Sequence, residues 1–181
     1  VNEALDAGIF VIAAAGNNGQ KANIKDVSIP ANIPGVIAVG ASTIGGKIWS
    51  NSSLGSNIDP YFNEERQFPN QKPEVTAPGV RMFSTASTEI TPAYAYSTGT
   101  SDSTVIVVGA LALLLQIHGT EMRGEDGKFD SGEMNLVKSA LANSSLKSQD
   151  MGAIHSNKSG YGELNAETWL EEIRIEFNLT K

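Results

Sequence analysis

The sequence of 181 residues contains no cysteine, only two histidines and no long run of basic residues. Without cysteine the chain can form no disulfide framework, thiol nucleophile or thiolate metal site. A formal net charge of −7 and a pI near 4.8 argue against binding to nucleic acid or to an anionic membrane surface. The sequence shows neither a signal peptide nor a lipidation motif, and it does not begin with methionine. We therefore expect it to start inside a larger domain.

Long apolar runs are also scarce. Val105–Leu115 has eleven residues without a charge or a hydrogen-bonding side chain, whereas a helix that crosses a bilayer needs about 20. We therefore expect no membrane span and place this run in a buried core helix from about Ser101 to His118, ended by Gly119. The small polar residues Ser97–Ser101 before it favour a turn. This arrangement puts Ser101 at the N-cap of the expected helix.

Two continuous apolar runs, Ile9–Ala15 and Val36–Ala41, are typical of parallel strands buried on both faces. The first run stops at Gly16–Gly19, a strong turn signal at the carboxyl end of a strand. Ligands bind at that end of the strands in open α/β sheets. We expect a hairpin strand to start at Lys47–Trp49 and two short strands to lie within Lys72–Ala86. Strands that alternate with turns and helices in this way predict a parallel α/β sheet.

The polar segments predict loops and helix ends. The composition of Asn51–Gln71 predicts a surface loop. Thr120–Asp130 carries several carboxylates but lacks the EF-hand register, so we expect a solvated turn there and keep a structural calcium ion as the alternative. The segment Asp130–Glu133 has the spacing of a capping box and predicts a helix over Gly132–Asn143. A final amphipathic helix is expected over Thr168–Phe177.

Six blocks of this sequence coincide, in order and across almost the whole chain, with one family. The chain resembles the subtilisin-like serine proteases, or subtilases. The resemblance implies an α/β fold with a three-layer parallel sheet, of which residues 1–181 would be the C-terminal half of one catalytic domain. The blocks that carry it are Val11–Gly19, Pro30–Ala41, Trp49–Gly55, Lys72–Val80, Gly99–Ser101 with Gly109, and Gly160–Ala166.

The resemblance gives Ser101 the role of nucleophile, within the motif Gly99-Thr100-Ser101. A catalytic serine needs a rigid, exposed turn, and helix amides behind it help to stabilise an oxyanion. From the residues alone, without the other blocks, a simple N-cap is the favoured interpretation of Ser101. An α/β-hydrolase esterase is disfavoured, because the Gly-x-Ser-x-Gly motif is absent around this serine.

The resemblance also assigns residues after the first strand. Asn17 corresponds to the oxyanion-hole asparagine of the family, whose side-chain amide donates to the developing alkoxide. The alternative for Asn17 is a turn residue that tolerates positive φ. Ala14, Ala15 and Gly16 resemble one wall of the pocket for the substrate residue before the scissile bond, where small residues leave room for a large apolar side chain.

Three departures from the family pattern bear on activity. The catalytic aspartate and histidine of the family lie upstream of the matched blocks, and we expect His118 and His155 to be surface or cap residues. The family usually has Met and Ala after the serine and a proline four residues on, whereas this chain has Asp102, Ser103 and Val105. Asp102 favours a helix N-terminus but places negative charge near the oxyanion.

Two functions therefore remain open. The first is a serine endopeptidase that uses an acyl-enzyme mechanism, cleaves peptides or proteins, requires no cofactor and depends on the N-terminal half of the same catalytic domain. The second is a subtilase-like pseudoprotease that binds peptides or serves a structural role without cutting. By the resemblance, an extracellular or cell-surface location is expected in either case.

Overall fold

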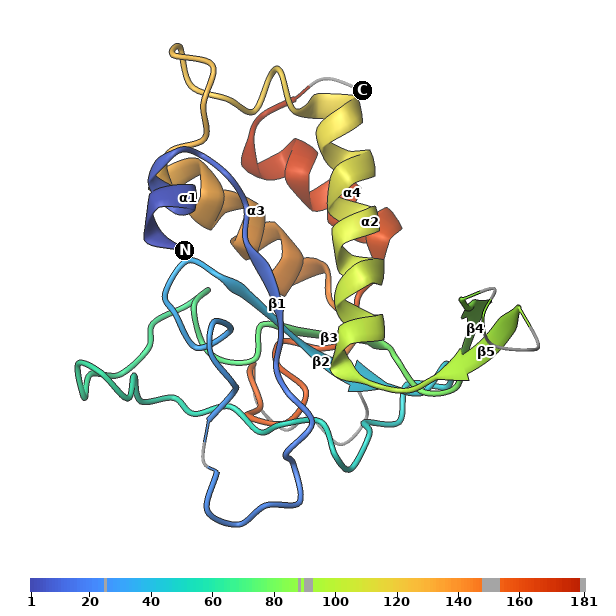
Figure 1. Ribbon diagram of the computed structural model, residues 1–181. Coiled ribbons are helices and arrows are strands. Elements are labelled where there is room, and N and C mark those ends of the chain that lie inside the picture. Colours follow the sequence, from blue (N-terminus) through green and yellow to red (C-terminus); the bar gives the residue numbers. More distant parts are fainter. Residues whose placement is uncertain (25, 88, 90–92, 148–153, 180–181) are drawn as a thin grey trace.

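The computed structural model describes residues 1–24, 26–87, 89, 93–147 and 154–179. At its centre lies a parallel sheet with the strand order β1-β2-β3 (Figure 1), formed by β1 (Ile12–Ala14), β2 (Ile37–Ser42) and β3 (Val75–Pro78). Because the strands are parallel, their carboxyl ends meet at one edge of the sheet. The predicted α/β fold class with a parallel sheet is confirmed.

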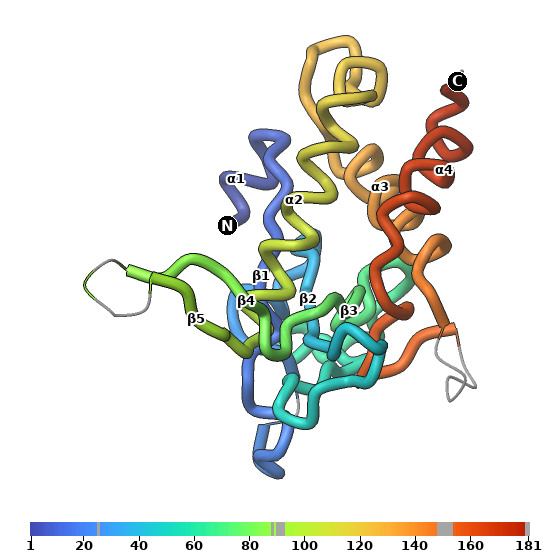
Figure 2. The backbone as a smooth tube through the Cα atoms, turned by 90° about the vertical axis from the view of Figure 1, so that its right-hand side faces the viewer, coloured from blue at the N-terminus to red at the C-terminus, as the bar shows by residue number. Residues whose placement is uncertain are grey.

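The two faces of the sheet are covered differently. Side chains alternate along β2, so that Ile37 and Val39 share a core with the helices, whereas Val36 and Ala38 pack against residues 27–33 on the opposite face. The three longer helices contribute to the first core (Figure 2), whereas Leu5 of the short first helix packs against both cores. The helices are α1 (Asn2–Asp6), α2 (Thr100–His118), α3 (Ser131–Ser144) and α4 (Ala166–Glu176).

The edge strand β1 is shorter than the apolar run Ile9–Ala15 that predicted it. Only Ile12–Ala14 pairs with β2, and Ile9 is 56% exposed. In the described part of the chain β1 is an edge strand, and the residues before Ile12 are exposed or only partly buried, so the expectation of burial on both faces is wrong for the first half of the run. The central strand β2 is buried at every position, as predicted.

Helix α3 begins at the predicted capping box. The Asp130 carboxylate accepts from the Glu133 N–H at 2.8 Å, and the Glu133 carboxylate accepts from the Asp130 N–H at 2.7 Å. In the preceding loop the Asp126 carboxylate accepts from the Lys128 N–H at 2.9 Å. Two of the carboxylates that raised the calcium alternative are therefore engaged by backbone amides. The last helix, α4, starts two residues earlier than expected, at the N-cap Asn165.

Helix α2 is less buried than its sequence predicts. Val107, Leu111 and Leu114 face the sheet, but Val105 is 70% and Leu113 62% exposed. By length and composition alone α2 could cross a membrane, although its buried face packs on the central sheet. The expectation of a fully buried helix is therefore wrong, because the described residues cover only one of its faces.

A small antiparallel hairpin, β4 (Met82–Thr85) and β5 (Tyr94–Ser97), projects beside the first turn of α2 (Figure 1). Both strands belong to a sheet of their own, and every residue of β5 is exposed. The hairpin strand expected to start at Lys47–Trp49 is reduced to a single antiparallel bridge between Ile48 and Ser42. Two backbone hydrogen bonds flank it, from the Thr43 N–H to the Lys47 carbonyl and from the Trp49 N–H to the Ala41 carbonyl.

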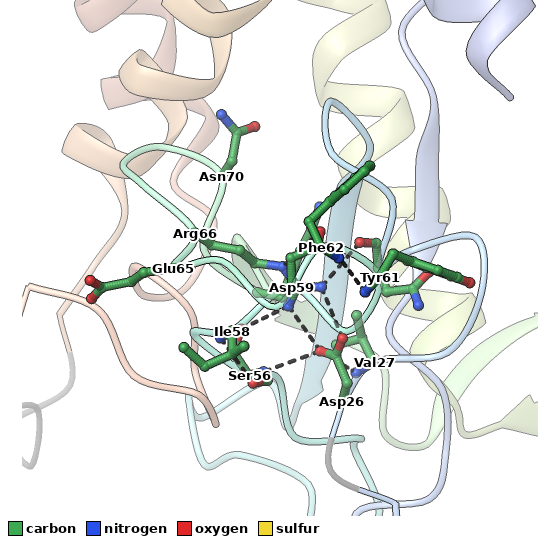
Figure 3. A network of polar contacts seen from close by, with 12 residues as sticks. Asp26, Val27, Ser56, Ile58, Asp59, Tyr61, Phe62, Glu65, Arg66 and Asn70 are labelled. Carbon is green, nitrogen blue, oxygen red and sulfur yellow. Dashed lines mark hydrogen bonds and ion pairs between the residues drawn. The ribbon is translucent and has the colours of Figure 1, made fainter.

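The predicted surface loop between residues 51 and 71 is fixed by one buried arginine (Figure 3). The Arg66 guanidinium donates to both carboxylate oxygens of Asp26 at 3.0 and 2.9 Å, and to the Ser56 and Asn32 carbonyls at 2.7 and 3.1 Å. Nearby, the Asp59 carboxylate accepts from two backbone amides of the loop. A bidentate pair of this kind orients as well as stabilises, so the loop is anchored although its outer residues are exposed.

A second ionic cluster lies buried where β3 meets α3. The Glu74 carboxylate contacts the ammonium groups of Lys72 at 2.9 Å and Lys138 at 2.7 Å, and it accepts from the Ala38 N–H at 2.7 Å. Lys72 also donates to the Val36 carbonyl at 2.6 Å. The three charged side chains are at most 2% exposed. The cluster thus connects the starts of β2 and β3 to α3.

Candidate active site

The carboxyl edge of the sheet collects the residues that the sequence singled out. The start of α2 is held against the end of β3, because the Gly99 N–H donates to the Gly79 carbonyl at 2.9 Å and the Ser103 hydroxyl donates to the Ala77 carbonyl at 2.8 Å. A Cβ atom on Gly79 would overlap both Ser103 Oγ and the Gly99 carbonyl. Glycine at this position therefore permits the contact that places Ser101.

The turn after β1 is joined to α2 through Thr100, which is 1% exposed. The Thr100 backbone N–H and its hydroxyl both donate to Asn17 Oδ1, at 3.1 and 2.9 Å. Thr100 Oγ1 in turn accepts from the Gly16 N–H at 3.1 Å. Because a backbone N–H can only donate, Oδ1 must face Thr100, and the Asn17 NH₂ group must point the other way.

The orientation of Asn17 also explains why one expectation fails. Ser101 is not the N-cap of α2: Gly99 occupies that position, and the helix starts at Thr100. The Asn17 side chain caps the Thr100 amide from a distant part of the chain, so no serine is needed for that purpose. Ser101 lies in the first turn of α2, where amides have no partner within the helix, and its side chain is exposed.

The space beside Gly99 is shared by two polar groups. Asn17 Nδ2 and Asp102 Oδ2 each lie 3.5 Å from the point where a Cβ atom on Gly99 would stand, so they are at most 7 Å apart. The Asp102 carboxylate is half-buried and accepts from the Ser97 hydroxyl at 3.1 Å. Asp102 is thus held beside the site by β5.

The three residues predicted to form a pocket wall are not equivalent. Gly16 has φ of 102°, and a Cβ atom on it would lie within 2.9 Å of Ser53 Oγ, so only glycine fits there. Ala14 is half-buried and borders the edge of the sheet. The Ala15 side chain is fully buried in the core on the far face of the sheet, which leaves only its backbone for a pocket wall.

Neither histidine lies near Ser101. His118 ends α2, about 26 Å along the helix from Ser101 at 1.5 Å per residue, and it accepts from Arg174 Nε at 3.1 Å. Of the two positions expected for it, surface or cap, the structure gives His118 the helix end, and its side chain is buried. His155 contacts the Pro73 carbonyl at 2.9 Å, beyond the opposite end of β3, and burial lowers the pKa of its imidazole.

Sequence reasoning did not assign two features of the site. Thr100 was recognised only as part of a motif, and its contacts with Asn17 depend on the fold. The contact of Asp102 with Ser97 was likewise not foreseen, although the short spacing along the chain was a usable signal. Within the described part of the chain, no three His, Asp or Glu side chains gather closely enough to hold a metal ion.

Comparison with known proteins gives consistent results. The model of the subtilase family matches residues 1–162. Subtilisin NAT from Bacillus subtilis subsp. natto is 39% identical over 120 residues, which are 66% of this chain and 27% of the relative. The thermophilic serine proteinase of Bacillus sp. strain AK1 is 37% identical over 114 residues, which are 63% of this chain and 23% of the relative.

Comparison with solved structures finds proteases of the same fold. The structure of the prenylagaramide maturation protease PagA superimposes with a TM-score of 0.67 at 25% identity, over 95% of this chain and 53% of that one. The patellamide maturation protease PatG shares the fold with a TM-score of 0.69 at 21% identity. The chain thus spans about half the length, or less, of the relatives it matches. With a family match over most of its residues, the chain belongs to the subtilase family.

Proposed function

We propose that this chain is the C-terminal half of a serine endopeptidase domain, in which Ser101 is the nucleophile and Asn17 an oxyanion donor. The observation that carries the proposal is the double hydrogen bond from Thr100 to Asn17 Oδ1, which turns the Asn17 NH₂ group outward beside the first turn of α2. Such an amide and the Ser101 N–H are two donors of the kind that stabilise a tetrahedral oxyanion.

In the proposed reaction, Ser101 Oγ attacks the carbonyl carbon of the scissile peptide bond and gives its proton to a histidine supplied by the rest of the domain. The carbonyl oxygen becomes an oxyanion that accepts from Asn17 Nδ2 and the Ser101 N–H. The C–N bond then breaks, the amine leaves with the proton, and an acyl-enzyme remains. Water then attacks the ester carbonyl and gives a proton to the histidine. The histidine returns that proton to Ser101 Oγ as the C–O bond breaks and the product acid leaves.

A phosphonylating probe tests the assignment of the nucleophile. In the complete protein, a fluorophosphonate should label Ser101, detected on the corresponding peptide by mass spectrometry, and Ser101→Ala should remove the label. The matched control is Ser131→Ala, since Ser131 is an exposed serine in the first turn of α3. The chain by itself lacks the general base and should react no faster than its Ser101→Ala variant. Labelling of another serine would overturn the assignment.

The partner that we propose is the remainder of the same catalytic domain, packed against β1 and α2. The outer edge of β1 is unpaired in the described sheet, and unpaired strand edges favour the addition of a strand. A groove of about 560 Å³ runs beside it, lined by apolar residues of α2 such as Val108 and Ala112 and by the segment that leads into β1, including Ile9. The exposed apolar face of α2 continues this groove.

The chain expressed alone should therefore expose a large apolar surface. We expect it to bind the dye ANS and to aggregate on concentration, and we expect co-expression with the rest of the domain to abolish both effects. A monodisperse monomer that melts cooperatively and does not bind ANS would contradict this expectation.

By analogy with the extracellular protease of Xanthomonas campestris, 33% identical over 126 residues, we propose an extracellular location.

A pseudoprotease is the second candidate, and the position of Asp102 favours it. In a complete triad, a carboxylate about 7 Å from the Asn17 amide would raise the barrier by about 2 kcal/mol at an effective dielectric constant near 20, or roughly thirtyfold in rate. Asp102→Asn in the complete protein should thus raise kcat/KM by up to that factor, and more at low salt than at high salt.

The control for Asp102 is Glu125→Gln, which removes the same charge from the exposed loop beyond the far end of α2. Its kcat/KM should equal that of the wild type at both ionic strengths. A rate that falls in Asp102→Asn would show that the contact between Asp102 and Ser97 supports the site, and the charge argument would be wrong. If neither protein cleaves peptides, the pseudoprotease is the better description.

A further inference from the structure

The β4–β5 hairpin gathers three aromatic rings and a cation on one face. In the antiparallel register Phe83 lies opposite Tyr96, and Thr85 lies opposite Tyr94. Because directly opposed residues and residues two apart share a face, Phe83, Tyr94 and Tyr96 point to the same side. Arg81, two residues before Phe83, extends this face toward the base of the hairpin.

The rings pack on one another and remain open to solvent. The Phe83 ring stacks on Tyr94 with centroids 5.5 Å apart and lies 5.1 Å from the Tyr96 centroid. Nevertheless Phe83 is 63%, Tyr96 64% and Tyr94 53% exposed. Contiguous exposed aromatic surface of this kind marks binding sites more often than isolated exposed residues do.

Arg81 provides charge at the base of this face. Its guanidinium lies 5.5 Å from the centre of the Tyr96 ring, and no carboxylate of the described residues lies within ion-pair distance of it. Arg81 has φ of 56°, which is uncommon for a residue with a Cβ atom, and its N–H donates to Thr98 Oγ1 at 2.9 Å. The backbone thus fixes Arg81 against Thr98, three residues before the candidate nucleophile.

The hairpin and the proposed pocket wall at Ala14–Gly16, which would contact the acyl side of the substrate, lie on opposite sides of Ser101. Strand β5 ends at Ser97, shortly before Ser101, whereas Gly16 and Asn17 contact Thr100 from the side of β1. In Figure 1 the hairpin projects to one side of the first turn of α2, and β1 lies on the other side. A peptide with its acyl side against the β1 turn would therefore extend its leaving-group side over the hairpin.

We propose that this hairpin face binds the leaving-group side of a peptide substrate that carries an acidic residue next to an aromatic or aliphatic one. Arg81 pairs with the carboxylate, and Phe83 and Tyr96 pack against the apolar side chain. Arg81 is well suited to this role, because its planar guanidinium can pair with a carboxylate while it remains stacked on Tyr96. The proposal rests on the endopeptidase function proposed above and specifies its substrate class.

The test uses the complete protein and three quenched fluorescent peptides that differ only on the leaving-group side, where Phe is followed by Glu, Gln or Lys. The Glu peptide should have a kcat/KM about fivefold higher than the Gln peptide, the upper range for an exposed ion pair, and the Lys peptide should be the poorest. Arg81→Gln should make the three peptides equal, and Arg81→Glu should favour the Lys peptide. Arg123→Gln is the matched control, since Arg123 is an exposed arginine over an aromatic ring at the far end of α2.

A second measurement separates this proposal from the endopeptidase function. The Kd of the same peptides for the Ser101→Ala variant, measured by fluorescence anisotropy, requires no hydrolysis and should show the same order. Absent hydrolysis with an Arg81-dependent order of Kd would overturn the enzyme but support the hairpin site. Phe83→Thr, which keeps strand propensity, should weaken binding of all three peptides. Equal Kd values, or a Glu preference that survives Arg81→Gln, would show that the hairpin face binds something else, such as the rest of the domain.

Discussion

Replacing Asn17 with alanine in the complete protein is expected to lower kcat by about 10²–10³, the loss that follows removal of one oxyanion-hole donor in subtilisin. KM should change little, because the Asn17 amide binds the oxyanion of the transition state and not the carbonyl of the bound substrate. The measurement is steady-state hydrolysis of a peptide anilide. Asn18→Ala is the matched control. Asn18 is the neighbouring asparagine, and its backbone N–H, which the substitution keeps, donates to Ser53 Oγ.

The same prediction extends to Thr100, which acts as a positioning residue for Asn17. Thr100→Val keeps the shape of the side chain but removes the hydroxyl that donates to Asn17 Oδ1 and accepts from the Gly16 N–H. We expect kcat to fall roughly tenfold to a hundredfold through misplacement of the amide, and Thr100→Ser to restore it. If Asn17→Ala and Thr100→Val both raise KM without lowering kcat, Asn17 binds substrate in the ground state and is not an oxyanion donor.

The parts of this fold that the sequence could predict are those set by local patterns. The apolar run of β2 and the capping box at Asp130 each specify their own element, and both are confirmed. Ser101 was also correctly placed at the start of the long helix. Its assignment as the N-cap failed because Gly99 occupies that position and the Thr100 amide donates to Asn17, 83 positions away in the sequence. No local pattern contains a contact of that kind.

The error on α2 has a different physical origin. Its apolar content predicted burial on all sides, and helices that are apolar all round are normally buried. In the described part of the chain the sheet covers one face, which leaves Val105 and Leu113 exposed. The same reasoning could not predict the aromatic face of the hairpin, because Phe83 and Tyr96 come together only through the register of two strands. Hydrophobicity along the sequence indicates what must be covered but not which segment covers it.

Replacing Glu74 with glutamine should destabilise the complete protein by about 3–5 kcal/mol, since it leaves two buried ammonium groups without a counter-charge. A typical domain has only about 5–15 kcal/mol of unfolding free energy, so the variant should unfold at a clearly lower urea concentration than the wild type. The measurement is urea unfolding followed by circular dichroism. Glu65→Gln removes the same charge from an exposed position of the neighbouring loop and should stay within about 0.5 kcal/mol of the wild type.

The pH dependence of unfolding provides a second signature of this cluster. Burial lowers the pKa of Lys72 from 10.5 to about 8, although the Glu74 carboxylate opposes the shift. Between these values the unfolded chain binds more protons than the folded one, so the Lys72 contribution to stability rises as the pH increases from about 8 to 10.5. In Glu74→Gln the opposing carboxylate is absent, so the rise should begin at a lower pH.

Glu74 itself makes the folding stability depend on pH in the acidic range. Burial alone would raise its pKa, but the ammonium groups of Lys138 and Lys72 outweigh burial and hold that pKa below its usual value of 4.5. The contribution of Glu74 is therefore complete above pH 4.5 and is lost as the pH falls through the lowered pKa. Glu74→Gln should lack this acid loss. A triple variant that combines Glu74→Gln with Lys72→Met and Lys138→Met should regain stability, because uncharged side chains need no counter-charge. If Glu74→Gln unfolds at the same urea concentration as the wild type, the ammonium groups are satisfied by the Val36 carbonyl and Asn70 alone, and the cluster is not held together by charge.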